Sequence, residues 1–328
     1  MKTYLSGDPI ADRRADYATM LAEAGDAGAA ADVMAQALDA APDWAAGWFR
    51  LGGLRETAGS VEQAAEAYRE ALRLDPADSF GAGLKLALLG TMPVPEAPSP
   101  AYVEGLFDQY ADRFETALVT RLDYRAPQAM AEALAATAGA DAAFARVLDL
   151  GCGTGLMGER LRGRASRLVG VDLSEGMIAK AARKGIYDEL HHADIAMFGE
   201  AAAYDLVTAA DVLSYLGDLS AVFAHLRRIA QPGALFAFTT ERHDGTEDFI
   251  LQPSLRYAHS SAYLVRLAET HGFELRQSEA LVLRQDRGEP VGGWLMILAV
   301  PSLGIAPFEA IIEAASPVSD DLAPSLVQ

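Results

Sequence analysis

After residue 101 the chain alternates short apolar runs with stretches that have the 3.6-residue period of amphipathic helices. The apolar runs have the length of strands and lie at Val147–Leu150, Arg167–Val171, Tyr204–Ala209 and Leu235–Thr239. The helical patterns lie between them, at Leu156–Arg162, Glu175–Arg183 and Leu219–Ile229. Strands that alternate with helices favour a mostly parallel sheet covered on both faces, so the pattern predicts an α/β fold.

The last part of the pattern differs, because two apolar runs follow each other without a helix between them. Glu274–Leu283 and Gly293–Val300 are joined through Gly288-Glu289-Pro290, which predicts an antiparallel hairpin at the sheet edge. Residues 301–328 contain four acidic side chains, no basic ones and four prolines. We expect one short helix there, at about Phe308–Ala315, and otherwise a loose tail.

The N-terminal part has a repeat of 34 residues. The residues Ala30, Met34, Ala37-Leu38 and Pro42 recur as Ala64, Tyr68, Ala71-Leu72 and Pro76. Together with Trp48, Leu51 and Gly52 they resemble the tetratricopeptide repeat, in which small residues let two helices approach closely. The resemblance implies helical pairs over residues 1–90, with a capping helix at about Phe80–Leu89.

Four prolines between Thr91 and Pro100 prevent both a helix and a central strand, and predict a linker over residues 91–101. The predicted organisation is therefore a helical-repeat domain (1–90), a linker (91–101), an α/β domain (102–300) and a tail (301–328).

The charge and composition of the chain disfavour several classes of partner and site. The net charge is −19, which disfavours nucleic acid and anionic membrane surfaces as partners. No apolar run approaches the ~18 residues that a membrane span needs, and the first residues lack the apolar core of a signal peptide. Cys152 is the single cysteine, so no intramolecular disulfide forms. We expect a cytoplasmic protein, and because no histidine pair has the spacing of a zinc site, no metal.

The chemistry of the α/β domain centres on a glycine-rich turn. Gly151, Gly153 and Gly155 follow a strand and precede a helix, where glycine lets the backbone approach a ligand. Asp172 follows the next strand and is placed to hold a ribose. These features alone fit a dinucleotide-binding protein equally well, because Gly153 to Gly158 also has the GxGxxG spacing.

Further acids favour a different cofactor. Asp149 lies two residues before the first glycine, where a pyrophosphate would be repelled and a cationic ammonium group attracted. Asp194 comes one strand later, where it can accept a hydrogen bond from an adenine amino group. With the Pro232-Gly233 turn, these motifs resemble, in order and spacing, those of class I S-adenosylmethionine (SAM)-dependent methyltransferases over roughly residues 102–300.

That resemblance implies a Rossmann-like seven-stranded sheet whose last hairpin is antiparallel, and SAM as cofactor. It implies that Asp172 holds the ribose and Asp194 the adenine amine, and that Asp211 lies near the methionine portion and the substrate. The residues implied for the cofactor site are Asp149, Gly151, Cys152, Gly153, Gly155, Asp172, Leu173, Met177, Asp194, Ile195 and Asp211.

Two further segments are candidates for substrate contact. Phe107, Tyr110 and Phe114 share one helical face, which indicates either a core-facing helix or a lid over the cofactor. Similar segments cover SAM in small-molecule methyltransferases. Arg125 follows this segment and is placed either to reach a carboxylate or to lie at the surface.

The second segment runs from Leu255 to Tyr263, after the fifth strand, where ligands approach the carboxyl ends of a parallel sheet. Arg256, Tyr257, His259 and Tyr263 are the candidate substrate contacts there, and His259, Tyr257 or Asp211 the candidate base. The alternative is that Ser260 or Ser261 only caps a helix that ends before Gly272.

Three functions remain open from the sequence. The leading one is transfer of a methyl group to a small polar or carboxylate-bearing metabolite. The second is methylation of a protein or carrier domain that the helical repeats recruit. The third is a non-catalytic SAM-binding scaffold, with the repeats mediating partner binding or self-association.

Overall fold

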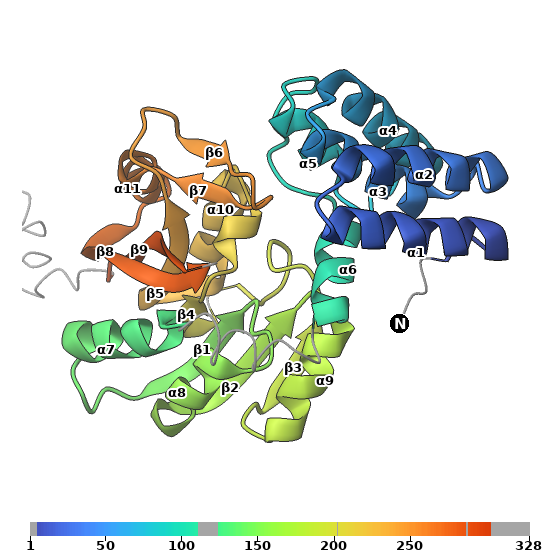
Figure 1. Cartoon of the computed structure of the whole chain (residues 1–328). Helices are drawn as coiled ribbons and strands as arrows, with labels where there is room; N and C mark the ends of the chain where they lie inside the picture. Colours follow the sequence, from blue (N-terminus) through green and yellow to red (C-terminus); the bar gives the residue numbers. More distant parts are fainter. Residues whose placement is uncertain (1–4, 111–123, 202, 287, 303–328) are drawn as a thin grey trace, which may run out of the picture.

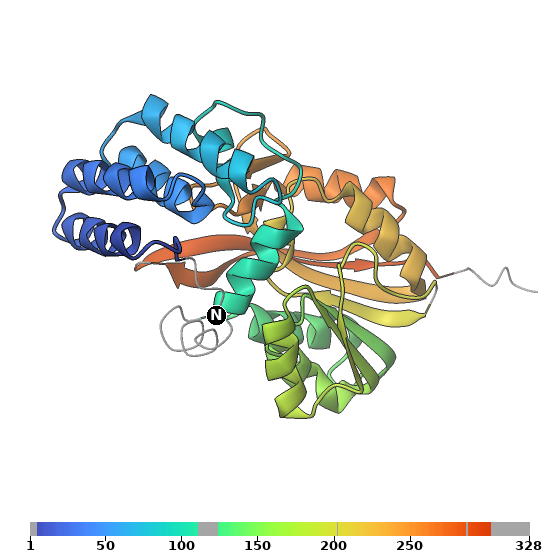
Figure 2. The same cartoon turned by 90° about the vertical axis from the view of Figure 1, so that its right-hand side faces the viewer.

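The structure, a computed structural model, describes residues 5–110, 124–201, 203–286 and 288–302. These residues form a helical domain and a sheet domain, joined by helix α6 (Pro100–Tyr110). Figure 1 shows the helical domain in blue at the upper right, with the sheet domain, coloured from green to orange, below and to the left of it. Figure 2 shows α6 running between the two domains.

The helical domain consists of two helix pairs and a shorter fifth helix. The helices are α1 (Pro9–Glu23), α2 (Ala27–Ala40), α3 (Ala45–Thr57), α4 (Val61–Leu74) and α5 (Ala82–Leu88). The recurring positions are buried in both copies, since Ala30 and Ala64, Met34 and Tyr68, and Ala37 and Ala71 are all at most 1% exposed. The 34-residue period therefore corresponds to a repeated packing of paired helices.

Helix α5 lies where the capping helix is predicted. Its residues Ala82 and Leu86 pack against Ala64, Tyr68 and Ala71 of α4 in one apolar cluster. The open side of the second pair is thus covered, which buries apolar surface that a terminal repeat would otherwise expose.

The sheet domain has the predicted α/β architecture. Its strands are β1 (Phe144–Leu150), β2 (Ala165–Asp172), β3 (Glu189–His192), β4 (Tyr204–Ala209), β5 (Ala230–Arg242), β6 (Phe249–Leu251), β7 (Tyr257–His259), β8 (Glu274–Asp286) and β9 (Glu289–Ala299). The order β3-β2-β1-β4-β5 is parallel, and β9 and β8 add the predicted antiparallel hairpin beside β5. A mostly parallel, Rossmann-like sheet is confirmed.

The expected number of seven strands is wrong, because the described residues form a nine-stranded sheet. The hairpin β6–β7 is the addition, and periodicity does not predict it. Its strands have three residues each, too short for an alternating pattern to register. Strand β7 pairs in parallel with the end of β5, at Glu241 and Arg242. The hairpin therefore extends the sheet toward the helical domain, as Figure 1 shows.

Two apolar layers cover the sheet. Helices α10 (Ser220–Ile229) and α11 (Ser261–Thr270) pack on one face, and α7 (Ala126–Ala138) and α8 (Leu156–Leu161) on the other. Helix α9 (Glu175–Lys184) follows β2, and short 3₁₀ turns lie at Arg162–Arg164 and Leu213–Tyr215. Ser260 caps α11 as predicted, because its hydroxyl accepts a hydrogen bond from Tyr263 N.

The proline-rich segment before α6 is neither helix nor strand, as predicted, but α6 begins at Pro100 and so includes the last residues of the predicted linker. The segment is also packed rather than free, because Glu96 O accepts hydrogen bonds from Gly217 N and Asp218 N. The predicted helix at Phe308–Ala315 lies outside the described residues. Within the described part of the chain, the helices are too short or too polar to span a bilayer.

The close approach of α3 and α4 yields a stability prediction. A Cβ atom at Gly52 would lie 2.5 Å from the Tyr68 ring, whereas at Gly53 the nearest contact is Tyr68 Oη at 3.7 Å. We expect Gly52→Ala to destabilise the protein by about 1–3 kcal/mol through overpacking. Gly53→Ala, the matched control, should be neutral or stabilising by up to about 1 kcal/mol, because alanine favours helix. Urea unfolding of both variants measures this, and equal effects would show that the helices adjust freely.

Candidate functional site

A cavity of about 370 Å³ opens at the carboxyl ends of β1, β2 and β4. One end is lined by the glycine turn and by acids that follow neighbouring strands, namely Gly151, Gly153, Asp172, Leu173, Asp194 and Ile195. These are six of the residues that the sequence proposes for the cofactor. Because parallel strands end at one edge of the sheet, residues far apart in the chain meet there.

The glycine turn has a conformation and a clearance that require glycine. Gly151, Gly153 and Gly155 have φ values of +61°, +52° and +94°, in the left-handed region. A Cβ atom at Gly151 would lie 2.4 Å from the side chain of Val212, in the loop after β4. The backbone of the turn therefore forms the cavity floor directly.

Asp172 fixes the turn from the next strand. Its carboxylate accepts hydrogen bonds from Gly153 N and Ser174 N, each at 2.8 Å. Burial raises the pKa of this carboxyl, and the two backbone donors oppose that shift. Asp172 thus orders the loop after β1 and also faces the cavity.

Asp149 lies below the turn and is not among the described residues that line the cavity. It is 1% exposed and accepts hydrogen bonds from Tyr187 Oη (2.6 Å) and Thr208 Oγ1 (2.9 Å). Burial raises its pKa to about 6, although these two hydrogen bonds lower it. In this structure its carboxylate is enclosed by Tyr187 and Thr208 rather than facing the cavity.

Three other proposed cofactor residues also lie beside the cavity rather than in its lining. Cys152 borders a smaller adjoining pocket, Gly155 begins α8, and Met177 is fully buried in α9. Met177 is therefore closed off from the cavity, and its backbone N–H donates to Ser174 Oγ.

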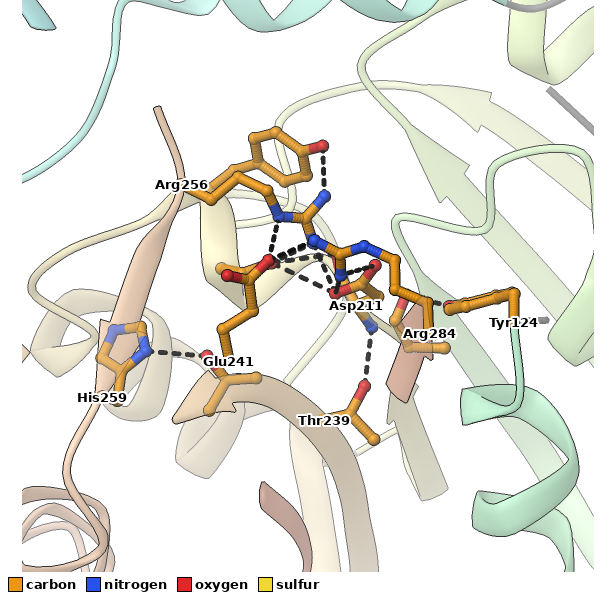
Figure 3. A network of polar contacts seen from close by, with 11 residues as sticks. Tyr124, Asp211, Thr239, Glu241, Arg256, His259 and Arg284 are labelled. Carbon is orange, nitrogen blue, oxygen red and sulfur yellow. Dashed lines mark hydrogen bonds and ion pairs between the residues drawn. The ribbon is translucent and has the colours of Figure 1, made fainter. Parts of the chain in front are cut away.

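The opposite end of the cavity is polar and built from four elements. Asp211, after β4, contacts both Arg256, before β7, and Arg284, on β8 (Figure 3). Arg256 Nη2 lies 2.5 Å from Asp211 Oδ1, and Arg284 Nη2 donates to Glu241 Oε1 of β5 at 2.5 Å. Arg256 Nε also approaches Glu241 Oε1 at 2.5 Å, as an ion-pair contact without hydrogen-bond geometry.

The charges of the two guanidinium groups and the two carboxylates thus balance each other, and all four groups are largely shielded from solvent. The exposed fractions of the four side chains are between 2% and 13%. Burial by itself would lower the pKa of Arg256, but the neighbouring Asp211, Tyr215 and Glu241 raise it above its usual value. Arg256 therefore stays charged while it lines the cavity.

Tyr124 and Tyr215 complete this end of the cavity. Tyr215 Oη accepts a hydrogen bond from Arg256 Nη1 at 2.6 Å, and its ring packs against Phe107 of α6. Burial raises the pKa of both phenols, so both keep their protons at neutral pH and can donate hydrogen bonds.

Reasoning from sequence missed Arg284, Glu241, Tyr124 and Tyr215. Glu241 and Arg284 lie just beyond the predicted strands Leu235–Thr239 and Glu274–Leu283, and the strand pattern assigns neither of them a role. The signal available for Glu241 and Arg284 was that each is a charged residue near the end of an apolar strand, which is a weak indication of a partner.

Three predicted substrate contacts are corrected by the structure. Tyr257 is fully buried and its hydroxyl donates to Pro95 O, while the Tyr263 hydroxyl donates to Asp218 and accepts from Leu219 N. His259 is also fully buried, and its Nε2 donates to Gly217 O while its Nδ1 accepts from Thr240 Oγ1.

Burial lowers the pKa of His259 to about 4, so the ring is neutral and has both nitrogens engaged. Figure 3 shows it to one side of the ionic network, and with both nitrogens bonded it is not available as a base. The side of the sheet that His259 faces cannot be inferred from the sequence, because β7 has only three residues and shows no alternating pattern.

The lid prediction is partly tested. Val103, Leu106 and Phe107 of α6 line the cavity, so this helix does cover it. Asp108 Oδ1 accepts from Ser174 Oγ and Gly176 N, which joins the end of α6 to the start of α9. The side chain of Tyr110, and Phe114 altogether, lie outside the described residues. Arg125 is exposed and precedes α7 rather than lining the cavity.

Comparisons with known proteins agree with this geometry. Residues 122–278 match the family model described as a methyltransferase domain. The chain carries a methyltransferase domain. Its cofactor is S-adenosylmethionine, which suits the left-handed glycine turn, the two cavity acids and the apolar Leu173 and Ile195 at one end of the cavity.

Curated relatives match the methyltransferase domain only in part. The chain is 34% identical over 101 residues to a ubiquinone biosynthesis O-methyltransferase of Hahella chejuensis. This match covers 29% of this chain and 42% of the relative. It is 35% identical over 116 residues to a malonyl-[acyl-carrier protein] O-methyltransferase of Enterobacter lignolyticus (35% and 44%). It is 33% identical over 129 residues to a trans-aconitate 2-methyltransferase of Methylobacterium nodulans (39% and 49%). The chain thus spans less than half the length of these three relatives.

Among solved structures, the fold is similar to that of the [4+2]-cyclase SpnF. The TM-score is 0.53 at 18% identity, and the match covers 63% of this chain and 98% of that one. This likeness shows the fold of the methyltransferase domain and nothing about its reaction.

The role of Asp172 can be tested through cofactor affinity. Asp172→Asn keeps the size of the side chain but removes a charged acceptor of two backbone hydrogen bonds. We expect SAM to bind about ten-fold to a hundred-fold more weakly, since hydrogen bonds to charged groups contribute about 1.5–3 kcal/mol. Calorimetric titration measures this, with the exposed Asp141→Asn as control. Unchanged affinity would sink the assignment.

The buried carboxyl of Asp149 predicts a pH dependence of stability. Its folded pKa, about 6, lies above the ordinary 3.8, so the folded state holds this proton to higher pH than the unfolded state does. This contribution to stability is present below about pH 4 and is lost as pH rises to about 6, by an amount on the order of 2 kcal/mol.

The measurement compares wild type with Asp149→Asn. Urea unfolding of both, without ligand, should give a difference in stability that changes in the mutant's favour between pH 4 and pH 6 and is constant above pH 7. A constant difference from pH 4 to pH 8 would contradict the raised pKa.

Proposed function

We propose that the chain is a SAM-dependent methyltransferase that methylates an oxygen atom of a small acceptor bearing a carboxylate. The observation that carries this proposal is the arrangement of the cavity. Its cofactor end leads directly into an end that holds two buried arginines and two protonated tyrosines. Guanidinium groups and phenols are the donors that bind a carboxylate by several hydrogen bonds.

Charge supports an anionic acceptor. Arg256 and Arg284 are balanced by Asp211 and Glu241, so the polar end is neutral as a whole. SAM, when bound, supplies an electrophilic methyl group on a positively charged sulfonium. An acceptor with a negative charge complements that cavity, and burial strengthens the attraction because solvent screening is weak there.

Proton chemistry supports a carboxylate as the reacting group. The described residues that line the cavity include neither histidine nor lysine, and the nearest acid, Asp211, is paired with two arginines. Both arginines thus occupy this carboxylate. An acceptor that is already ionised at neutral pH needs no base, and the protein then contributes mainly by positioning it.

The names of two relatives fit this acceptor class. One is a malonyl-[acyl-carrier protein] O-methyltransferase and another a trans-aconitate 2-methyltransferase, and both names specify carboxylic acids. The name of the other relative, a ubiquinone biosynthesis O-methyltransferase, does not specify a carboxylic acid, so this relative represents a competing class of acceptor. The similarity to a cyclase by fold makes a direct assay of transfer necessary.

An assay with methyl-labelled SAM distinguishes these outcomes. The panel is trans-aconitate, malonate and 3,4-dihydroxybenzoate, offered to the full chain. We expect label to enter trans-aconitate or malonate as a methyl ester, which mild alkali cleaves to labelled methanol. Label that is stable to alkali indicates an aryl ether and a phenolic acceptor. No transfer to any acceptor, with SAM bound, would favour the scaffold hypothesis.

Arg256→Lys tests the anion contact. Lysine keeps the charge but lacks the planar fork, so the KM for the acid should rise about ten-fold or more while SAM affinity changes little. The control is Arg242→Lys, which changes an arginine at the end of the same sheet that pairs with exposed Asp244. Equal KM values for both variants would remove Arg256 from the acceptor site.

A carrier-bound acceptor is a second candidate, favoured by the malonyl-[acyl-carrier protein] relative and by a helical domain that is bonded to the segment lining the cavity. Malonyl thioester on an acyl carrier protein, compared with free malonate, decides between them. A much higher kcat/KM for the carrier-bound acid supports recruitment of a protein, and equal values support a free metabolite.

A further inference from the structure

Part of the cavity wall comes from outside the methyltransferase-domain match. Ala97, Pro98 and Pro100 line the cavity, although the matched region begins at residue 122. They belong to the proline-rich segment between the two domains. A segment expected to act only as a linker therefore forms part of the cavity wall.

This segment is held on the sheet-domain side by its backbone. Glu96 O accepts from Gly217 N at 2.7 Å and from Asp218 N at 3.1 Å, and the Tyr257 hydroxyl donates to Pro95 O at 2.8 Å. Proline fixes its own φ, so these few bonds suffice to hold the segment in one path.

Gly217 is the point where three elements meet. A Cβ atom there would lie 2.7 Å from the Phe249 ring, 2.9 Å from the Tyr257 ring and 3.0 Å from Glu96 O. The loop after β4, the β6–β7 hairpin and the proline-rich segment are thus in contact at one glycine.

The same segment is held on the helical-domain side. The Ser99 hydroxyl donates to Asp78 O at 2.9 Å and accepts from Tyr102 N at 3.0 Å. Tyr102 packs over Gly81, where a Cβ atom would lie 2.9 Å from its ring. The start of α6 is therefore anchored to the helical domain.

Tyr257 joins these contacts to the polar end of the cavity. Its ring belongs to an apolar cluster with Leu84 and Ala87 of α5 and Leu251 of β6. The residue before it in the chain is Arg256, whose guanidinium lines the cavity and pairs with Asp211. One side chain thus contacts the helical domain, the proline-rich segment and the strand that presents Arg256.

We propose that residues 97–100 form a fixed wall of the acceptor pocket, that the helical domain holds this wall in place from behind, and that Tyr257 is the positioning residue that keeps the wall beside Arg256. The inference rests on the proposed function, because it assigns the acceptor to that end of the cavity. Tyr257 takes no part in the transfer itself and acts through Pro95 and Arg256.

The test uses the full chain with Tyr257→Phe, which keeps the ring packing and removes only the hydroxyl that donates to Pro95 O. Tyr68→Phe is the matched control, since Tyr68 is also fully buried and donates one hydrogen bond, to Glu56, within the helical domain. The first readout is hydrogen exchange of the Gly217 and Asp218 amides, because both donate to Glu96 O.

We expect these two amides to exchange about five-fold faster in Tyr257→Phe and at the wild-type rate in Tyr68→Phe. With the best acid of the assay panel, KM should rise about five-fold, while kcat and the Kd of SAM stay within about two-fold. Ser99→Ala, which releases the segment from the helical domain, should raise KM in the same direction.

Wild-type exchange at Gly217 and Asp218 in Tyr257→Phe overturns the proposal. So does equally faster exchange throughout the sheet domain, which indicates a general loss of stability, or a change confined to kcat. If no acid of the panel is methylated, the proposed function fails, and the exchange measurement still decides whether Tyr257 holds the wall.

Discussion

Four buried charges determine how the strands of the sheet domain meet at the cavity. Asp211, Glu241, Arg256 and Arg284 come from the ends of β4 and β5, the start of β7 and the last part of β8. Removing water from a charge costs several kcal/mol, and in such a place the cost is offset only by a partner in good geometry. Each element must therefore place its charged side chain next to the other three. This requirement fixes the loop after β4, the β6–β7 hairpin and the β8–β9 hairpin relative to one another.

Much of the domain follows from local patterns. Apolar runs between Val147 and Val300 indicate the strands, and glycine, serine and proline mark where helices begin and end, so the sheet and its helices could be predicted. The glycine turn with Asp172 and Asp194 could be predicted too, because in a parallel sheet the position of a motif along the chain determines its position in space. The same reasoning placed Asp149 at the turn but could not show that Tyr187 and Thr208 enclose its carboxylate.

The polar end of the cavity could be predicted only in part, for a physical reason. Arg256 and Asp211 follow strands and are visible in the sequence. Glu241 of β5 and Arg284 of β8 meet only because both strands pair with β9 in the folded sheet. Tyr257 and His259 have the residue types of a catalytic site but serve as packing and hydrogen-bonding groups, since a three-residue strand gives no periodicity from which their orientation could be inferred. The helical repeat was more accessible, because its small residues mark the helix contacts directly.

The backbone conformation at Asp211 limits which residue types can occupy this position. Its φ is +60°, a left-handed conformation that glycine adopts without strain and most other residues adopt at a cost. Asparagine has nearly the same shape as aspartate and tolerates this conformation equally well, so conformation alone selects neither of the two. What distinguishes aspartate is the charge that two neighbouring guanidinium groups require. Among relatives of this chain, a neutral residue at the equivalent position should therefore be accompanied by the loss of one of the two arginines.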